Sequence, residues 1–327
     1  MSVKLYIDAI TDAMRQEMER DPAVFILGED VGVRGGVFRT TQGLIDQFGE
    51  ERVMDTPLAE SAIVGVAVGA AAYGMRPIAE IQFADFILPA VNQIISEAAK
   101  LRYRSNNDWQ CPLVIRAPFG GGVHGALYHS QSLEALFYHI PGLKVVIPST
   151  AYDAKGLLIS AIRDPDPVIY FEHKGMYRLI KDEVPDDDYV VPIGKAAVRR
   201  DGTDITVITY GLMSHYTLTA AEELAKEGIS AHVLDLRSIL PLDKEAILEA
   251  VRKTGKVLIV HEDNKTGGVG AEVSAIIAEE ALFELDAPIA RLGGPEIPAM
   301  PFSPPLEKFY MLNPDKIAKA MRELAAF

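Results

Sequence analysis

The sequence predicts an α/β protein with two domains, on the strength of its pattern and its length. Short apolar runs alternate with longer helical patterns along nearly the whole chain, as successive βαβ units do. The strand-like runs are apolar throughout, which is typical of parallel strands covered on both faces. The chain has 327 residues, about twice the usual length of one domain, so its length predicts two domains or one large one.

The first domain should alternate strands with helices. Apolar runs predict strands at 24–28, 77–83, 113–116, 145–147 and 168–171, and helical patterns predict helices near 5–20, 59–74, 86–104, 132–139 and 151–163. Residues 181–192 then combine a run of charges with two prolines, which predicts a linker or a surface excursion. We therefore place the first domain at 1–190 and the second at 191–327.

The second domain repeats the same pattern. It predicts strands at 205–209, 231–235, 257–260 and 289–292, and helices at 217–227, 243–252, 269–284 and 314–326. Gly228 and Gly255 end two of these helices, and Asn313 stands where its side chain could cap the last one.

Charge and cysteine content exclude several functions. There are 32 Lys and Arg against 46 Asp and Glu, and this net charge of −14 argues against binding to nucleic acids or anionic membranes. The only cysteine, Cys111, permits neither an intrachain disulfide nor a cysteine-based metal cluster, and it suits a reducing compartment. Polar residues interrupt the N-terminal segment, and the longest apolar run, 62–74, is too short to cross a membrane. We expect a cytoplasmic protein.

Glu60 is the first candidate for a functional residue. It stands on the first turn of a predicted helix whose body, 62–74, is apolar on every face and should be buried in a core or a subunit interface. A partly buried carboxylate there could exchange a proton with a nitrogen base. The residues alone leave a second interpretation open, which is a favourable charge at a helix N-terminus.

His124 and His129 share one loop that begins with Gly120-Gly-Gly122. Histidine at the end of a strand in an α/β fold suits acid–base chemistry, although the glycines could equally form a plain loop. No third nitrogen or sulfur ligand lies at zinc spacing. Dinucleotide-binding, P-loop, nucleophile-elbow and zinc-protease motifs are all absent from the sequence.

Motifs along the whole chain carry a resemblance to a known family. They are Gly28-Glu-Asp-Val-Gly32, Gly35-Gly-Val-Phe-Arg39, Asp55-Thr-Pro-Leu-Ala-Glu60, Ala79-Glu-Ile-Gln-Phe-Ala-Asp85, Lys100-Leu-Arg-Tyr-Arg-Ser105, Tyr128-His-Ser-Gln-Ser132, Pro141-Gly-Leu-Lys-Val-Val-Ile-Pro148, Asp153-Ala-Lys-Gly-Leu-Leu158 and Asp235-Leu-Arg237. The set resembles the β subunit of the thiamine-diphosphate-dependent 2-oxo acid dehydrogenases. Phe83-Ala-Asp85 and the segment 124–131 are more similar to the branched-chain enzyme than to the pyruvate enzyme.

The resemblance implies a pyrimidine-binding domain, then a transketolase C-terminal-type domain, and an α2β2 heterotetramer that holds thiamine diphosphate between α and β chains. By matching position, Glu60 faces N1′ of the aminopyrimidine and shares a proton with it, which activates the thiazolium carbon. Phe86 matches a ring that stacks on the pyrimidine, and Leu58 and Gln82 match cofactor-binding positions.

The same resemblance gives His129 a role in the reductive acylation of a lipoyl group, because an imidazolium can protonate the leaving sulfur. His124 matches no catalytic position. A potassium site would map to Leu113, Ala161, Ile162, Asp164 and Asp166, with an ordinary helix C-terminus as the equally weighted alternative.

One family motif is missing. The diphosphate–magnesium motif begins Gly-Asp-Gly and ends in asparagine, and this chain has only Asp201-Gly202. The α subunit is therefore expected to hold magnesium and the diphosphate, and a lipoyl-bearing acyltransferase, with its subunit-binding domain, is the expected further partner. The pyruvate enzyme is the alternative within the family. A self-sufficient transketolase-like synthase and a non-catalytic assembly subunit are the alternatives outside it.

Overall fold

The computed structural model describes residues 1–327 and divides into two compact units. The first contains Met1–Phe119 and Leu136–Ile193, and the second contains Gly120–Ala135 and Gly194–Phe327. The predicted two-domain α/β fold is confirmed. The structure adds that the histidine loop, Gly120–Ala135, belongs to the second unit although the first unit surrounds it in sequence.

The main sheet of the first unit is parallel. Its strands run in the order β6-β7-β5-β4-β2-β3, where β2 is Val24–Gly28, β3 Val53–Asp55, β4 Arg76–Glu80, β5 Val114–Phe119, β6 Lys144–Val146 and β7 Val168–His173. These strands are almost wholly buried, as their apolar runs predict. Only β3 was missed, because its sequence Val-Met-Asp ends in an exposed carboxylate and forms no apolar run.

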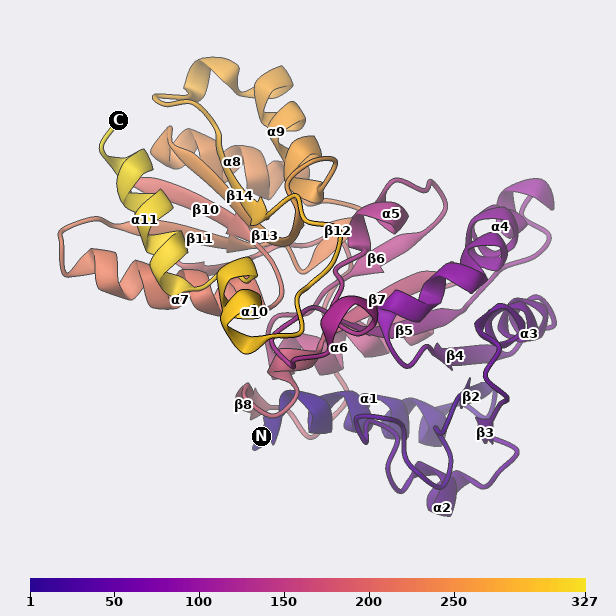
Figure 1. Cartoon of the computed structure of the whole chain (residues 1–327). Helices are drawn as coiled ribbons and strands as arrows, with labels where there is room; N and C mark the ends of the chain where they lie inside the picture. The colour runs from indigo at the N-terminus through magenta and orange to yellow at the C-terminus, as the bar shows by residue number, and fades with distance from the viewer. The chain divides into compact units, whose positions relative to one another are not determined.

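Helices pack on this sheet in two groups (Figure 1). Helix α1 (Tyr6–Arg20) packs against α6 (Ala151–Arg163), and α3 (Glu60–Ala72) packs against the short helices η1 (Ala84–Ala90) and η2 (Gln93–Glu97). The predicted single helix at 86–104 is wrong: the segment is broken into η1, η2, η3 (Ala98–Lys100) and α4 (Leu101–Arg104). Pro89 lies inside η1, and a proline lacks the N–H that a continuous helix needs. The remaining helices are α2 (Leu44–Phe48), α5 (Glu134–Tyr138), η4 (Ala126–Tyr128) and η5 (Lys174–Met176).

The predicted linker at 181–192 is partly wrong. Its first residues form β8 (Lys181–Val184), which pairs antiparallel with β1 (Ser2–Leu5). The next residues are fixed by Lys155, whose buried ammonium donates to the carbonyl oxygens of Pro185, Asp186 and Asp187 at 2.7, 3.2 and 3.2 Å. A charged run can therefore be ordered when a buried cation satisfies its backbone.

The second unit has its own sheet, in the order β14-β13-β10-β11-β9. The strands are β9 (Ala197–Arg200), β10 (Ile205–Thr209), β11 (Ala231–Asp235), β13 (Val257–Asn264) and β14 (Ala290–Gly294), and only β9 is antiparallel to its neighbour. Figure 1 shows helices α8 (Lys244–Thr254) and α9 (Val269–Glu280) on one side of this sheet and α7 (Leu212–Ala225) and α11 (Pro314–Ala325) on the other.

Shorter elements complete this unit: β12 (Ser238–Leu240), η6 (Leu282–Glu284) and α10 (Pro304–Tyr310). The predicted cap is confirmed, because the Asn313 side chain accepts a hydrogen bond from Lys316 N at 2.9 Å. No helix of the structure combines the length and the apolar character needed to span a membrane.

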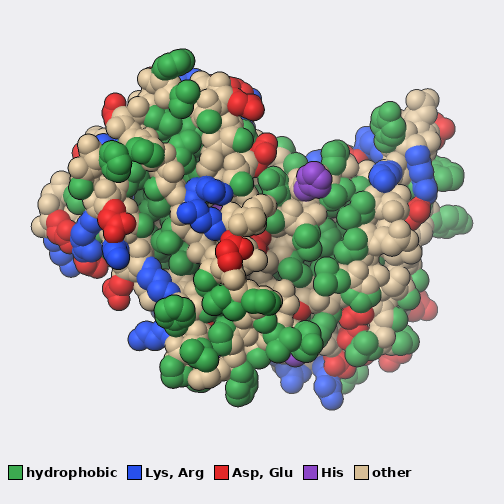
Figure 2. All heavy atoms as spheres, turned by 45° about the horizontal axis from the view of Figure 1, so that its top comes forward, with side chains coloured by type: hydrophobic (Ala, Val, Ile, Leu, Met, Phe, Trp, Pro, Cys, Tyr) green, Lys and Arg blue, Asp and Glu red, His purple; other side chains and the backbone are tan.

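In the isolated chain helix α3 is buried on one side only, which leaves the interface as the prediction for its other side. One side, with Ile63, Val64, Ala67, Val68 and Ala71, is buried. The other side exposes Ala62, Val66, Gly69 and Tyr73, and a Cβ added at Gly69 would meet nothing within 4 Å. Hydrophobic side chains also reach the surface elsewhere, as Figure 2 shows.

Candidate active site

The first group of site residues lies at the carboxyl ends of three neighbouring strands. In the order β4-β2-β3, Gly28 stands in register with Glu80 on one side and Asp55 on the other. The Asp55 carboxylate accepts a hydrogen bond from Gly32 N at 2.6 Å, which fixes the turn after β2. Ligand sites of parallel sheets form at such carboxyl ends.

Glu60 is the first residue of α3 and is half-buried. Beside it, Glu29 is buried directly after β2, and burial, followed by the charges of Glu60 and Asp30, raises the pKa of Glu29. Glu29 therefore holds a proton more readily than an exposed glutamate, close to the Glu60 carboxyl group. Glu29 is not among the site residues predicted from the sequence, although it lies inside the motif 28–32 directly after a buried strand.

The predicted aromatic partner, Phe86, lies in η1 and is half-buried. It meets Phe83 edge-on, with ring centroids 5.8 Å apart, and Phe83 packs against Phe38 at 5.3 Å. Gln82 is half-buried between β4 and η1, whereas Leu58 is 78% exposed in the isolated chain. These residues border the same sheet edge as Glu60, but the Leu58 side chain is left open to solvent.

A buried ion cluster supports this edge from within the sheet. Arg116 on β5 donates to Glu80 Oε2 at 2.6 Å and to both oxygens of Glu172 on β7 at 2.6 and 2.9 Å. Tyr177 adds a hydrogen bond to Glu172 Oε2 at 2.7 Å. Burial raises the pKa of Glu80, and the charge of Arg116 counteracts this effect. The cluster thereby fixes the end of β4, two residues before Gln82.

The second group of site residues belongs to the histidine loop, in the other unit. A hydrogen bond from Gly120 N to Gln131 O, 3.0 Å long, joins the start of the loop to a residue near its end. His129 is half-buried, and a Cβ added at Gly125 would lie 2.7 Å from the Cβ of His129. Glycine at 125 therefore allows the loop to fold back closely on His129. His139, by contrast, is exposed just beyond α5.

Two acidic residues of the second unit, Glu134 and Asp263, lie at the C-terminal end of this loop. Tyr210 OH donates to Glu134 Oε1 at 2.9 Å, while Glu134 Oε2 is buried without a hydrogen-bond partner. Burial, followed by the charge of Asp263, raises the pKa of Glu134 well above its usual value. Burial also raises the pKa of Asp263 to about 6. Glu134 therefore takes up a proton far more readily than an exposed glutamate.

In the isolated chain the predicted potassium ligands contact both cationic side chains and backbone N–H groups. Lys144 Nζ lies 2.7 Å from both carboxylate oxygens of Asp164, and Arg102 pairs with Asp166 at 2.6 Å. Arg76 donates to Ile162 O at 2.8 Å. The carbonyl oxygens of Leu113 and Ala161 accept backbone N–H groups of residues 168 and 164. Each of these carbonyl oxygens has a second lone pair, so the potassium site stays a prediction.

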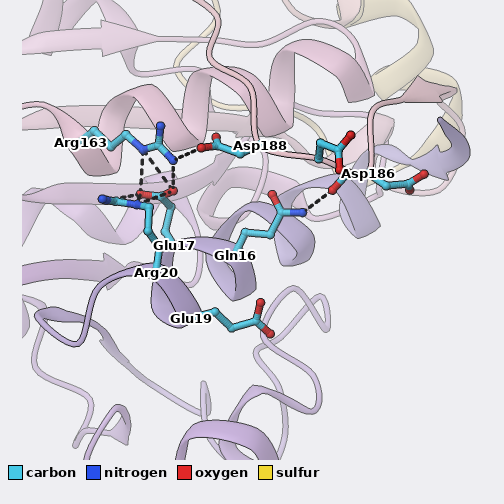
Figure 3. Close-up of a pocket in the computed structure, with 8 residues that line it drawn as sticks. Gln16, Glu17, Glu19, Arg20, Arg163, Asp186 and Asp188 are labelled. Atoms are coloured by element: carbon cyan, nitrogen blue, oxygen red, sulfur yellow. Dashed lines mark hydrogen bonds and ion pairs between the residues drawn. The ribbon is translucent and has the colours of Figure 1, made fainter.

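A surface pocket of the first unit is lined by side chains that form ion pairs with one another (Figure 3). Glu17 accepts hydrogen bonds from both Arg20 and Arg163, and Arg163 also pairs with Asp188 at 2.8 Å. The full lining is Gln16, Glu17, Glu19, Arg20, Arg163, Asp186, Asp187 and Asp188. Because these charged side chains pair with one another, we interpret the pocket as a structural feature of the first unit and not as a binding site.

Comparison with known proteins agrees with the motifs. The transketolase pyrimidine-binding domain model matches residues 4–180, and the transketolase C-terminal domain model matches residues 194–317. The chain is 72% identical over 327 residues to the 2-oxoisovalerate dehydrogenase subunit beta of Bacillus subtilis (strain 168), with 100% of both chains covered. It is 49% identical over 327 residues, again with 100% of both covered, to the pyruvate dehydrogenase E1 component subunit beta of the same organism.

Among solved structures, a split gene transketolase described as an inactive beta4 tetramer matches with a TM-score of 0.79 and 25% sequence identity, covering 98% of each chain. The family resemblance predicted from the motifs is thereby confirmed.

Proposed function

This chain belongs to the β-subunit family of the thiamine-diphosphate-dependent 2-oxo acid dehydrogenases, and we propose that it is the β subunit of a branched-chain 2-oxo acid dehydrogenase. The observation that carries the substrate class is the difference in identity over the full chain: 72% to a 2-oxoisovalerate dehydrogenase β subunit against 49% to a pyruvate dehydrogenase β subunit. The reaction is the oxidative decarboxylation of a 2-oxo acid followed by transfer of the acyl group to a lipoyl group.

Glu60 is the proposed catalytic carboxylate. When bound, thiamine diphosphate supplies the carbanion chemistry that a decarboxylation needs. The half-buried place of Glu60 at the start of α3, with Glu29 next to it, suits a carboxyl group that exchanges a proton with the aminopyrimidine. Phe86, Gln82 and Leu58 are the proposed binding residues for the pyrimidine. Exposure of Leu58 is consistent with a site that a second chain completes.

His129 is the proposed acid in the transfer to the lipoyl group. An imidazolium can deliver a proton to the sulfur that leaves when the dithiolane ring opens. The absence of a side chain at Gly125 lets the loop backbone lie close to His129. We expect His129→Ala to reduce lipoyl acylation more strongly than it reduces decarboxylation measured with an artificial electron acceptor.

The proposed partner is an α subunit that supplies the diphosphate and magnesium site in an α2β2 heterotetramer. The absence of the diphosphate motif from this sequence supports this assignment. A lipoyl-bearing acyltransferase, through its subunit-binding domain, is the proposed acceptor. The cytoplasmic location stays a prediction. Potassium stays a proposed ligand of Leu113, Ala161, Ile162, Asp164 and Asp166. A higher melting temperature in potassium chloride than in sodium chloride would support it, and equal melting temperatures would contradict it.

The test is a substrate comparison on the assembled enzyme. The chain is reconstituted with its α subunit, and kcat/KM is measured for 3-methyl-2-oxobutanoate and for pyruvate. A preference of at least ~10-fold for the branched substrate is expected, since extra methyl groups in a fitted apolar pocket discriminate by about this factor. A preference for pyruvate would assign the chain to the pyruvate enzyme. Turnover by the β chain alone would contradict the shared cofactor site.

A further inference from the structure

Glu307, on α10, uses both of its carboxylate oxygens on the histidine loop. Its side chain is 3% exposed. Oε1 accepts hydrogen bonds from Gly122 N at 3.2 Å and from His124 N at 3.1 Å, and Oε2 lies against His124 Nδ1. The His124 side chain is 57% exposed. The contact therefore joins a buried carboxylate to an imidazole at the surface of the loop. Hydrogen bonds to a charged, buried acceptor are among the stronger ones in proteins.

The backbone at this point needs such support. His124 and Ala126 have φ angles of 56° and 57°, in the left-handed region that residues other than glycine rarely occupy. At the neighbouring Gly121, N–H donates to Glu262 Oε1 at 2.6 Å, and an added Cβ would lie 2.5 Å from Met300. The loop therefore depends on contacts with residues that are far away in the sequence.

We propose that Glu307 and His124 form a latch that positions His129 for its reaction. Gly125 links the two: it follows His124, and its missing side chain lets the backbone lie against His129. A shift of the backbone at 124–125 is therefore passed on to the His129 side chain. His124 acts through Glu307 and through the backbone, and it transfers no proton to substrate. This proposal rests on the role of His129 proposed above.

The test uses variants that change the latch with as little other damage as possible. Glu307→Gln keeps one oxygen that can accept from the loop amides but loses the charge, and Glu307→Ala removes every contact. His124→Asn removes the imidazole, and asparagine tolerates a left-handed backbone. Lys308→Gln is the matched control, since Lys308 is the next residue on α10 and is exposed.

Two quantities are measured on the enzyme assembled with its α subunit. The first is hydrogen–deuterium exchange in peptides that cover residues 120–135, which does not depend on activity. The second is the ratio of lipoyl acylation to decarboxylation with an artificial electron acceptor. His129→Ala is measured beside the other variants as the reference for a complete loss of the histidine.

We expect Glu307→Ala to raise exchange in the loop by at least ~10-fold, from the loss of hydrogen bonds to a charged acceptor. Glu307→Gln should give a smaller increase, and both variants should lower the acylation ratio in the same order. Combining Glu307→Gln with His124→Asn should lower the ratio little further than either change alone, because the two side chains act as one contact. Lys308→Gln should leave exchange and ratio unchanged.

Unchanged exchange in both Glu307 variants would overturn the latch. So would faster exchange with an unaltered ratio, provided that His129→Ala lowers the ratio. Additive losses in the double variant would show that His124 acts independently of Glu307, which also contradicts the proposal. If His129→Ala leaves the ratio unchanged, the proposed role of His129 is wrong, and exchange alone decides whether Glu307 anchors the loop.

Discussion

The buried carboxyl groups of the two units have different partners. In the first, Glu80 and Glu172 both accept hydrogen bonds from Arg116, so the cluster contains its own cation. In the second, Glu134 accepts from a tyrosine hydroxyl, and the charge of Asp263 raises its pKa further. An internal cation counteracts the burial that raises the pKa of a carboxyl group, whereas a second acid beside it raises that pKa further. The first region should therefore respond to the loss of a charge, and the second to pH.

Removing Arg116 should have the largest effect on stability. Arg116→Leu leaves Glu80 and Glu172 buried without a counter-charge, which costs about 3–5 kcal/mol. Chemical unfolding of the purified chain measures this loss. Arg15→Leu is the control, because Arg15 forms a half-exposed pair with Asp12 that is worth at most ~1 kcal/mol. Adding Glu172→Gln should restore part of the stability. Equal losses for Arg116 and Arg15 would show that the buried cation does not matter.

Replacing Glu60 tests the same region by activity. Glu60→Gln should leave the assembled enzyme folded and lower decarboxylation by at least ~10²-fold, the scale of a lost general acid–base step. Steady-state turnover with saturating thiamine diphosphate measures the loss, and Glu51→Gln, at an exposed position, is the control. Near-normal turnover would leave Glu60 only its favourable charge at the start of α3.

Some strands and site residues of this protein can be predicted from the sequence, and others cannot. Strands such as β2 and β7 are predicted because their apolar runs are unbroken. The pair β1 and β8 is missed because both strands are polar and meet only through the fold. Glu60 and His129 are found through motifs, since their types and neighbours are local. Glu262 and Glu307 are missed because they contact the loop across 141 and 185 positions of sequence, and no local pattern carries that information.

The stability of the second unit should depend on pH through Asp263. The pKa of Asp263 is raised from 3.8 to about 6, so its favourable contribution is complete below pH 4 and is lost as pH rises through 6. Asp263→Asn should therefore gain about 2–3 kcal/mol relative to the natural chain between pH 4 and pH 8. Unfolding free energies at pH 4, 6 and 8 measure this gain, with Asp46→Asn, at an exposed position, as the control. A pH-independent difference would contradict the buried, proton-binding carboxyl.

The smallest effect is expected on the exposed side of α3, the helix that begins with Glu60. Its exposed apolar stripe contains Gly69, and the sequence analysis placed such a helix in a core or an interface. We predict a contact with the second β chain here, which Gly69→Leu should overpack at a cost of ~1–3 kcal/mol, presented twice by symmetry.

In the isolated chain a side chain at 69 meets nothing within 4 Å, so the stability of free β chains should not fall, and Gly69→Ala should have a weaker effect on assembly than leucine. Sedimentation of the reconstituted enzyme at micromolar concentration decides between the possibilities. Release of αβ units or free chains by leucine, graded through alanine, is the expected result. An intact α2β2 species with unchanged dissociation would mean that this face of α3 stays open to solvent in the assembled enzyme.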